Sequence, residues 1–160
     1  MKTRLRMAAG GLAAICTLTL TGCGSDSSPK AAAEKTSEAN FTTAADEGVC
    51  TSEATPLDEP YGDGFPADWP FPPDTVVYNV EDRGASGTIV TAVSSAKFAS
   101  ILDFMNKDVV DAGFEIERGE TEKHDAEAEW RGSDFHGRWA IRESGQCQGE
   151  TVIQVLAGEN

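Results

Sequence analysis

The sequence predicts an α+β fold: a two-layer sandwich in which one amphipathic helix packs on one face of an antiparallel sheet of about five or six strands. Two observations predict this fold class. Short segments that are rich in β-branched residues, or that alternate apolar and polar residues, recur between glycine-containing turns. One longer segment repeats its apolar residues with the period of a helix. The predicted order is β-β-α-β-β-β-β, and connections of hairpin length require antiparallel pairing.

The first two predicted strands flank EDRGASG, a glycine-containing sequence that suits a hairpin turn. After the helix, Phe114 and Ile116 alternate with glutamates, which is typical of a strand with one solvated face. Three further segments complete the sheet. The predicted strands are residues 75–80, 87–93, 114–120, 124–131, 137–143 and 151–157.

The helix is predicted within SSAKFASILDFMNKDVVDAGF, whose apolar residues follow the i, i+3, i+4, i+7 spacing of one face. Ser94 or Ser95 is the expected N-cap, and Gly113 is placed for a left-handed C-terminal cap. The apolar face is typical of core packing, so Met105 needs no special role. This face comprises Phe98, Ile101, Leu102, Met105, Val109 and, one step round, Val110.

A proline-rich lead segment, residues 56–74, precedes the first strand. It contains six prolines and four aromatic residues. Proline removes a backbone donor and disfavours helix in the preceding residue, so the segment is expected to be extended and irregular. We expect Phe65, Trp69 and Phe71 to fasten it to the domain rather than to await a ligand.

The N-terminus has the features of an export signal. Three basic residues precede a short apolar run from Met7 to Leu20, which is too short to span a membrane. The run ends in Leu20-Thr21-Gly22-Cys23, which resembles the lipobox of bacterial lipoproteins. The resemblance implies that residues 1–22 are removed and that Cys23 carries fatty acyl chains such as palmitate. It also implies a lipid-anchored, extracytoplasmic location at the cell membrane.

These patterns divide the chain into three parts. Residues 1–22 are the signal peptide, and residues 23–47 are the lipidated cysteine with a tether too poor in apolar residues to order itself. Residues 48–160 form a single domain that can bury one core. The combination of glycine-turn strands and a proline-rich lead loosely resembles small exported lipoprotein domains, a resemblance of pattern that implies no active residue.

The charge of the chain excludes some partners. The net charge is −14, and removal of the three basic residues of the leader makes it −17. A polyanion of this size is repelled by nucleic acid and by anionic lipid head groups. The same acidity keeps an exported protein soluble, which is the simpler interpretation.

Two of the four cysteines remain for the folded domain. Cys16 leaves with the signal peptide, and Cys23 is the proposed lipid site. Cys50 and Cys147 lie near the two ends of the domain, and an oxidising compartment favours a disulfide between them over two free thiols. Two cysteines without CxxC spacing support neither a structural zinc site nor a thioredoxin-like motif.

Residues 124–143 place Ser133, Asp134 and His136 between two tryptophans, and a β-hairpin accounts for most of the segment. A two-residue loop at Ser133-Asp134 sets small residues against tryptophan on one face and acids against arginines on the other. A shift by one residue would bury arginine against tryptophan. The predicted cross-strand pairs are Asp125–Arg142, Ala126–Ile141, Ala128–Trp139, Glu129–Arg138 and Trp130–Gly137.

The hairpin tip offers residue types that could do chemistry. A hydrolytic serine needs a base within reach and oxyanion donors, and Ser133 is expected on an exposed tip without a GxSxG context. His124 and His136 could meet near one end of the hairpin, with Asp125 or Asp134, and bind a metal weakly. We expect no catalytic residue, metal or cofactor here. The acidic run of residues 58–68 lacks the ordered spacing of a calcium loop.

The favoured function is a non-enzymatic, membrane-anchored binding or accessory module for an envelope protein, a wall polymer or a small ligand. The alternative is a small envelope hydrolase or metal-dependent enzyme that uses His136 with Ser133 or nearby carboxylates. The domain is expected to be monomeric and to have no nucleic-acid partner. The expected partner surface comprises Tyr78, Arg131, Ser133, Asp134, His136, Arg138 and Arg142.

Overall fold

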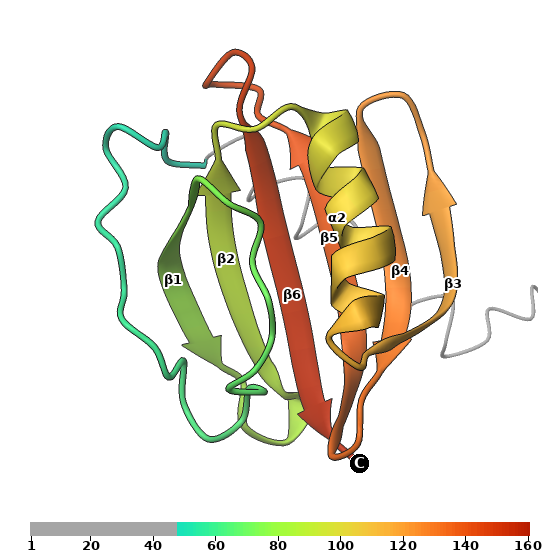
Figure 1. Ribbon diagram of the computed structural model, residues 1–160. Coiled ribbons are helices and arrows are strands. Elements are labelled where there is room, and N and C mark those ends of the chain that lie inside the picture. Colours follow the sequence, from blue (N-terminus) through green and yellow to red (C-terminus); the bar gives the residue numbers. More distant parts are fainter. Residues whose placement is uncertain (1–47) are drawn as a thin grey trace, which may run out of the picture.

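A computed structural model describes residues 48–160, which form an α+β sandwich of a six-stranded sheet and one α-helix (Figure 1). The predicted signal peptide, lipidation site and tether lie outside the described residues. The elements are β1 (Thr75–Asp82), a short 3-10 helix η1 (Gly84–Ser86), β2 (Thr88–Ser94), α2 (Phe98–Asp111), β3 (Glu115–Thr121), β4 (Asp125–Arg131), β5 (Phe135–Glu143) and β6 (Thr151–Glu159). The predicted fold class and element order are confirmed.

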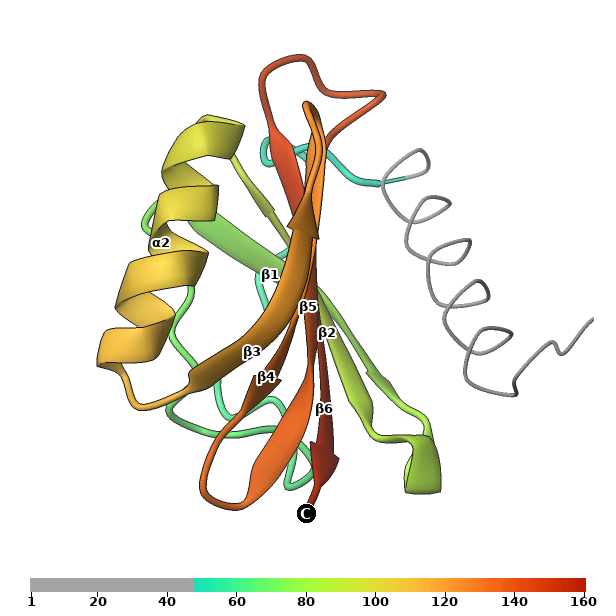
Figure 2. The same cartoon turned by 90° about the vertical axis from the view of Figure 1, so that its right-hand side faces the viewer.

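All neighbouring strands run antiparallel, in the spatial order β1-β2-β6-β5-β4-β3. The last strand therefore lies in the middle of the sheet, and α2 carries the chain from β2 to the opposite edge at β3. Helix α2 contacts β5 and β3 and covers one face of that half of the sheet (Figures 1 and 2). Because only one helix packs on this face of the sheet, the lead segment has to cover much of the other half of the same face.

The hairpin of β4 and β5 has the predicted register. Ala128 faces Trp139 and Trp130 faces Gly137, while the two-residue turn closes with a hydrogen bond from the Gly132 amide to the Phe135 carbonyl, 2.8 Å long. Side chains alternate between the faces of a strand, so both tryptophans point to the helix side. Each tryptophan is about 1% exposed, and the hairpin thus supplies two of the three buried tryptophans of the core.

The start of the helix differs from the prediction. Neither Ser94 nor Ser95 is the N-cap: α2 begins at Phe98, and its cap, Lys97, makes no side-chain capping bond. Ser94 instead ends β2, where its hydroxyl accepts a hydrogen bond from the Ala96 amide at 3.2 Å. Sheet pairing with β1 and β6 extends through Ser94, and the N-cap lies at Lys97, two or three residues later than the serine pattern indicates.

The end of the helix matches the prediction at Gly113. Its φ of 101° is left-handed, a conformation that glycine adopts without a steric penalty. The Gly113 amide donates to the Val110 carbonyl at 2.9 Å, and the Phe114 amide donates to the Val109 carbonyl at 3.2 Å. These two bonds form a Schellman motif, which directs Phe114 back into the core.

An aromatic cluster joins the lead segment to the sheet and to the end of the helix. The ring of Trp69 lies 4.6 Å from that of Trp130 and 4.8 Å from that of Phe114, between centroids. Phe65 and Trp69 are buried, and Phe71 is partly buried against the same core. The lead segment, residues 56–74, thus covers sheet surface that the helix does not reach (Figure 1).

Candidate functional site

Arg131, Arg138 and Arg142 lie on the sheet face opposite the helix, because they alternate with residues buried on the helix side. Figure 2 shows the helix and the sheet as two layers. Arg138 and Arg142 on β5 alternate with the buried Trp139 and Ile141, and Arg131 on β4 alternates with the buried Trp130. The pairing of β4 with β5 brings all three arginines onto one strip of this face. The register that buries the tryptophans is therefore the same one that assembles the arginines.

Carboxylates of β3 and β4 neutralise this strip. Arg131 pairs with Glu117 at 3.1 Å, and Arg138 forms an ion pair with Glu127. Arg118 adds a third pair, with Glu129 at 2.6 Å, and a hollow of about 130 Å³ lies among these side chains. The side chains of Arg138 and Glu127 are only 17% and 26% exposed, so this pair is the least screened by solvent. A partner would meet alternating charge here rather than a positive patch.

The hairpin tip is held by the C-terminal residue. The Asn160 amide donates to the Asp134 carbonyl at 3.0 Å, and the Asn160 side chain donates to the Ser133 carbonyl at 3.0 Å. The Ser133 hydroxyl donates to the Asp134 carboxylate at 3.2 Å. His136 is exposed beside Gly158, and the described contacts include no hydrogen bond between Ser133 and His136. The tip therefore has the geometry of a turn and no proton relay.

The two histidines, which the sequence left open as a possible weak metal pair, do not meet. His136 pairs with Arg131 at the turn end of the hairpin. His124 lies at the opposite end, where its Nδ1 is 2.7 Å from the Glu143 carboxylate. The antiparallel register separates residues at the start of β4 from residues at the start of β5, and the full length of both strands lies between them.

Tyr78 lies in β1 where the register with β2 shifts, and it is half-buried. Burial raises the pKa of Tyr78 above its usual value, and a backbone hydrogen bond with Val49 partly offsets that rise. Burial also raises the pKa of Tyr61, which lies beside the carboxylates of Glu59 and Asp58. Tyr78 therefore belongs to the packing of the N-terminal residues of the domain against the sheet.

These two tyrosines give a pH prediction because the chain contains no others. Folding favours the neutral phenols, so their contribution to stability is present below the unfolded pKa of about 10 and is lost as the pH rises through the folded values. We expect phenolate absorbance to appear at higher pH in the native protein than in the denatured protein. Superimposable titration curves would contradict the burial of both rings.

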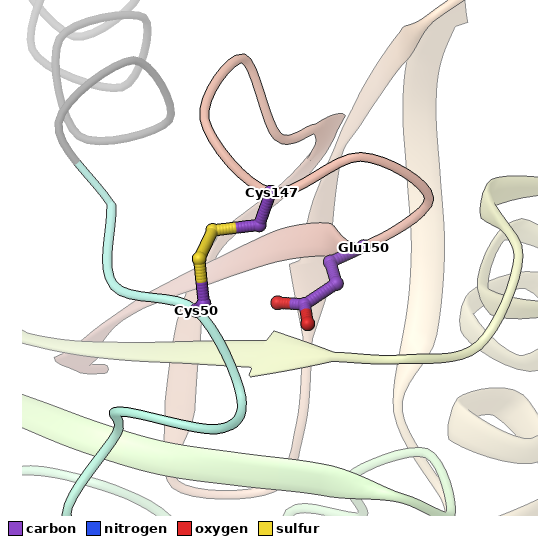
Figure 3. Close-up of side chains that lie close together, drawn as sticks. All are labelled: Cys50, Cys147 and Glu150. Atoms are coloured by element: carbon purple, nitrogen blue, oxygen red, sulfur yellow. A yellow bond between two sulfur atoms is a disulfide. The ribbon is translucent and has the colours of Figure 1, made fainter.

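A disulfide joins Cys50 to Cys147, as predicted, and fastens the start of the domain to the loop between β5 and β6 (Figure 3). Glu150 lies beside it and accepts hydrogen bonds from the Thr51 amide at 2.8 Å and the Thr51 hydroxyl at 2.6 Å. Within residues 48–160, these two sulfurs and the Glu150 carboxylate are the one close group of three potential metal ligands. Because both sulfurs are oxidised to the disulfide, the group is a structural clamp.

No protein-family model, curated protein or solved structure matches this chain. The described part of the chain also contains no helix long and apolar enough to cross a bilayer.

Sequence reasoning missed a hollow of about 600 Å³ at the end of the sheet where β6 terminates. Three segments that are distant in sequence enclose it: the lead segment, the hairpin of β1 and β2, and the end of β6. Its lining combines Tyr61, three exposed carboxylates, three small or apolar side chains and the backbone of five glycines. The lining residues are Tyr61, Gly62, Asp63, Gly64, Val80, Asp82, Gly84, Ala85, Gly87, Thr88, Gly158 and Glu159. The acidic run of residues 58–68 was the only sequence signal.

Proposed function

We propose that this protein is a lipid-anchored binding module of the cell envelope. The observation that carries the proposal is the sequence Leu20-Thr21-Gly22-Cys23 after a basic and apolar leader, in the pattern of a lipobox. Acyl chains on Cys23 would hold the protein on a bilayer, since each buried CH₂ group contributes about 0.8 kcal/mol. The disulfide supports export, because such bonds persist in oxidising compartments.

The arrangement of the domain supports binding rather than catalysis. Ser133 and Asp134 form the two-residue turn, whereas His136 lies in β5 and lines neither of the two hollows described above. A nucleophile requires an adjacent base and a group that orients that base. The sheet face opposite the helix instead presents polar groups on hydrogen-bonded strands, which suits recognition of a partner.

The lipid anchor is tested by replacing Cys23 with alanine in the full chain expressed in a bacterial host. We expect the wild-type protein to fractionate with membranes and its mature N-terminal peptide to carry acyl chains by mass spectrometry. The Cys23→Ala variant is expected to lose the acyl mass and to leave the membrane fraction. Cys16→Ala is the matched control, because it removes a thiol from the leader without changing the proposed lipid site.

The binding role is tested in the same cells by chemical crosslinking followed by mass spectrometry of captured molecules. Charge reversal at Arg131 and Arg142 is expected to reduce capture if the sheet face contacts the partner. Equal capture by the variants would contradict the use of this face. Retention of Cys23→Ala on the membrane without acyl mass would contradict the anchor.

A further inference from the structure

We propose that the outer edge of β3 binds an extended segment of an envelope protein, which adds a strand to the sheet and alternates basic with apolar residues. This inference rests on the proposed binding function and names the kind of partner. Strand β3 is last in the strand order and pairs with β4 alone. The opposite edge, at β1, differs because the lead segment runs past it and the Leu57 amide donates to the Val77 carbonyl at 2.9 Å (Figure 1).

Two residues of β3 direct their backbone groups away from the sheet. The Glu122 amide donates to the Asp125 carbonyl at 2.8 Å and closes the hairpin of β3 and β4. Bonded and non-bonded positions alternate in an antiparallel pair, so Glu120 also bonds to β4, whereas the N–H and C=O groups of Gly119 and Thr121 point outward. Within residues 48–160, the backbone hydrogen bonds outside the strand ladders include neither of these two residues. An extended segment can pair with both through its own backbone.

The side chains on the face away from α2 favour a basic residue in the added strand. Glu120 lies directly opposite Glu127, and like charges in this arrangement repel each other. Glu127 forms an ion pair with Arg138, whereas none of the ion pairs within residues 48–160 includes Glu120. The residue of an added strand that faces Glu120 would have its Cβ atom about 5 Å from the Cβ atom of this glutamate. A lysine or arginine at that position would neutralise the glutamate.

The side chains on the helix side of the sheet favour apolar residues in the added strand. Gly119 and Thr121 lie across from Ala128 and Ala126, which are each 4% exposed. An added strand would extend this apolar side, and a strand in a sheet with one packed face alternates apolar and polar residues. The binding segment is therefore expected to alternate residues such as lysine and valine.

The same edge disfavours a second copy of this chain. If Gly119 paired with Thr121 of a second copy and the reverse, Glu120 would face the same glutamate of that copy. The register of β3 also shifts between Ile116 and Arg118, and such bulges, together with charged side chains, limit unselective pairing of edge strands. Repulsion of an acidic strand and attraction of a basic one together make the edge selective.

The test is NMR spectroscopy of the full lipidated protein in micelles of an uncharged detergent, titrated with the synthetic peptide TKVKVKT. We expect bound peptide to slow amide hydrogen exchange at Gly119 and Thr121 about tenfold or more, because a new hydrogen bond protects each amide. Exchange at Glu120, which already bonds to β4, is expected to change little. The control peptides are TEVEVET, which reverses the charge, and fully N-methylated TKVKVKT, which keeps the charge and lacks backbone donors. We expect both controls to bind about tenfold more weakly or worse.

A pair of variants tests the same contact from the side of the protein. Thr121→Pro removes one outward donor, and proline is tolerated on an edge strand where the backbone nitrogen faces solvent. Thr121→Val is the matched control, because it keeps the donor and a β-branched side chain. We expect Thr121→Pro to bind TKVKVKT about tenfold more weakly and Thr121→Val to bind it within about twofold of wild type.

Equal binding of the acidic or the N-methylated peptide would overturn the proposal, since backbone pairing with a basic strand would then not account for binding. Absence of binding at about 1 mM peptide, or exchange that does not slow at Gly119 and Thr121, would also overturn it. Protection of these two amides before peptide is added would overturn it as well, because another segment or a second copy would then cover the edge. If Thr121→Pro does not fold, the three peptides on wild-type protein decide the matter. None of these results depends on Cys23→Ala or on charge reversal at Arg131 and Arg142, so the anchor and the sheet face succeed or fail separately.

Discussion

Replacement of both Cys50 and Cys147 with serine is expected to lower the free energy of unfolding by about 4–5 kcal/mol. The two cysteines are 97 residues apart in sequence, so the disulfide closes a loop that spans most of the domain. Closing so long a loop restricts the unfolded chain strongly, and the folded domain loses that advantage when the bond is absent. Urea denaturation monitored by tryptophan fluorescence measures the change.

The neighbouring variant Glu150→Gln is the control for this experiment. It keeps the disulfide and weakens the hydrogen bonds to Thr51, so we expect a loss of no more than about 1 kcal/mol. If the double serine variant unfolds at the same urea concentration as wild type, the covalent link contributes nothing. A loss as large in Glu150→Gln would assign the effect to the carboxylate instead.

The second large effect is expected from Gly137→Ala, with a loss of about 3 kcal/mol of stability. A Cβ atom at this position would overlap the Leu156 carbonyl oxygen of the neighbouring strand and would lie 3.0 Å from Trp130 Cζ2. A backbone carbonyl in a central strand cannot move without disturbing the sheet pairing. The indole of Trp130 is also fully enclosed and has little room to retreat.

Gly158→Ala is a matched control on β6, the strand beside β5. The nearest atom to a Cβ there is His136 Cε1, at 3.6 Å, which is an ordinary contact. We expect a change within about 0.5 kcal/mol. Comparable losses in the two variants would show that strand glycine in general, and not the space beside Trp130, determines the cost.

The hairpin of β4 and β5 could be predicted in detail because its constraints are local. Face parity excluded a shift by one residue, and small residues opposite Trp130 and Trp139 selected one register. The C-terminal cap at Gly113 could also be predicted, because it depends only on neighbouring residues of the chain. The N-cap could not be identified, because extension of β2 to Ser94 depends on pairing with Thr151, a residue remote in sequence.

The position of β6 and the hollow could not be predicted for the same reason. No local pattern states that the last strand enters between β2 and β5, and that insertion alone brings Glu159 near Asp82 and Tyr61. Closeness in sequence can also mislead: His124 and His136 belong to one hairpin, but they lie at its two opposite ends. Composition identified an acidic loop at residues 58–68. Only the strand order shows which other segments lie beside this loop and line the hollow with it.

The position of the disulfide also determines how the domain would bear a mechanical load applied at its N-terminus. A pull through Cys50 passes to Cys147 and then to β5 and β6, the two strands in the middle of the sheet. Without that link the load would follow the main chain through the proline-rich segment to β1, an edge strand with hydrogen bonds to β2 alone in the sheet. An edge strand can be peeled away one rung at a time, whereas central strands share the load across many bonds at once. The disulfide thus transfers the applied force to the central strands instead of to the edge strand β1.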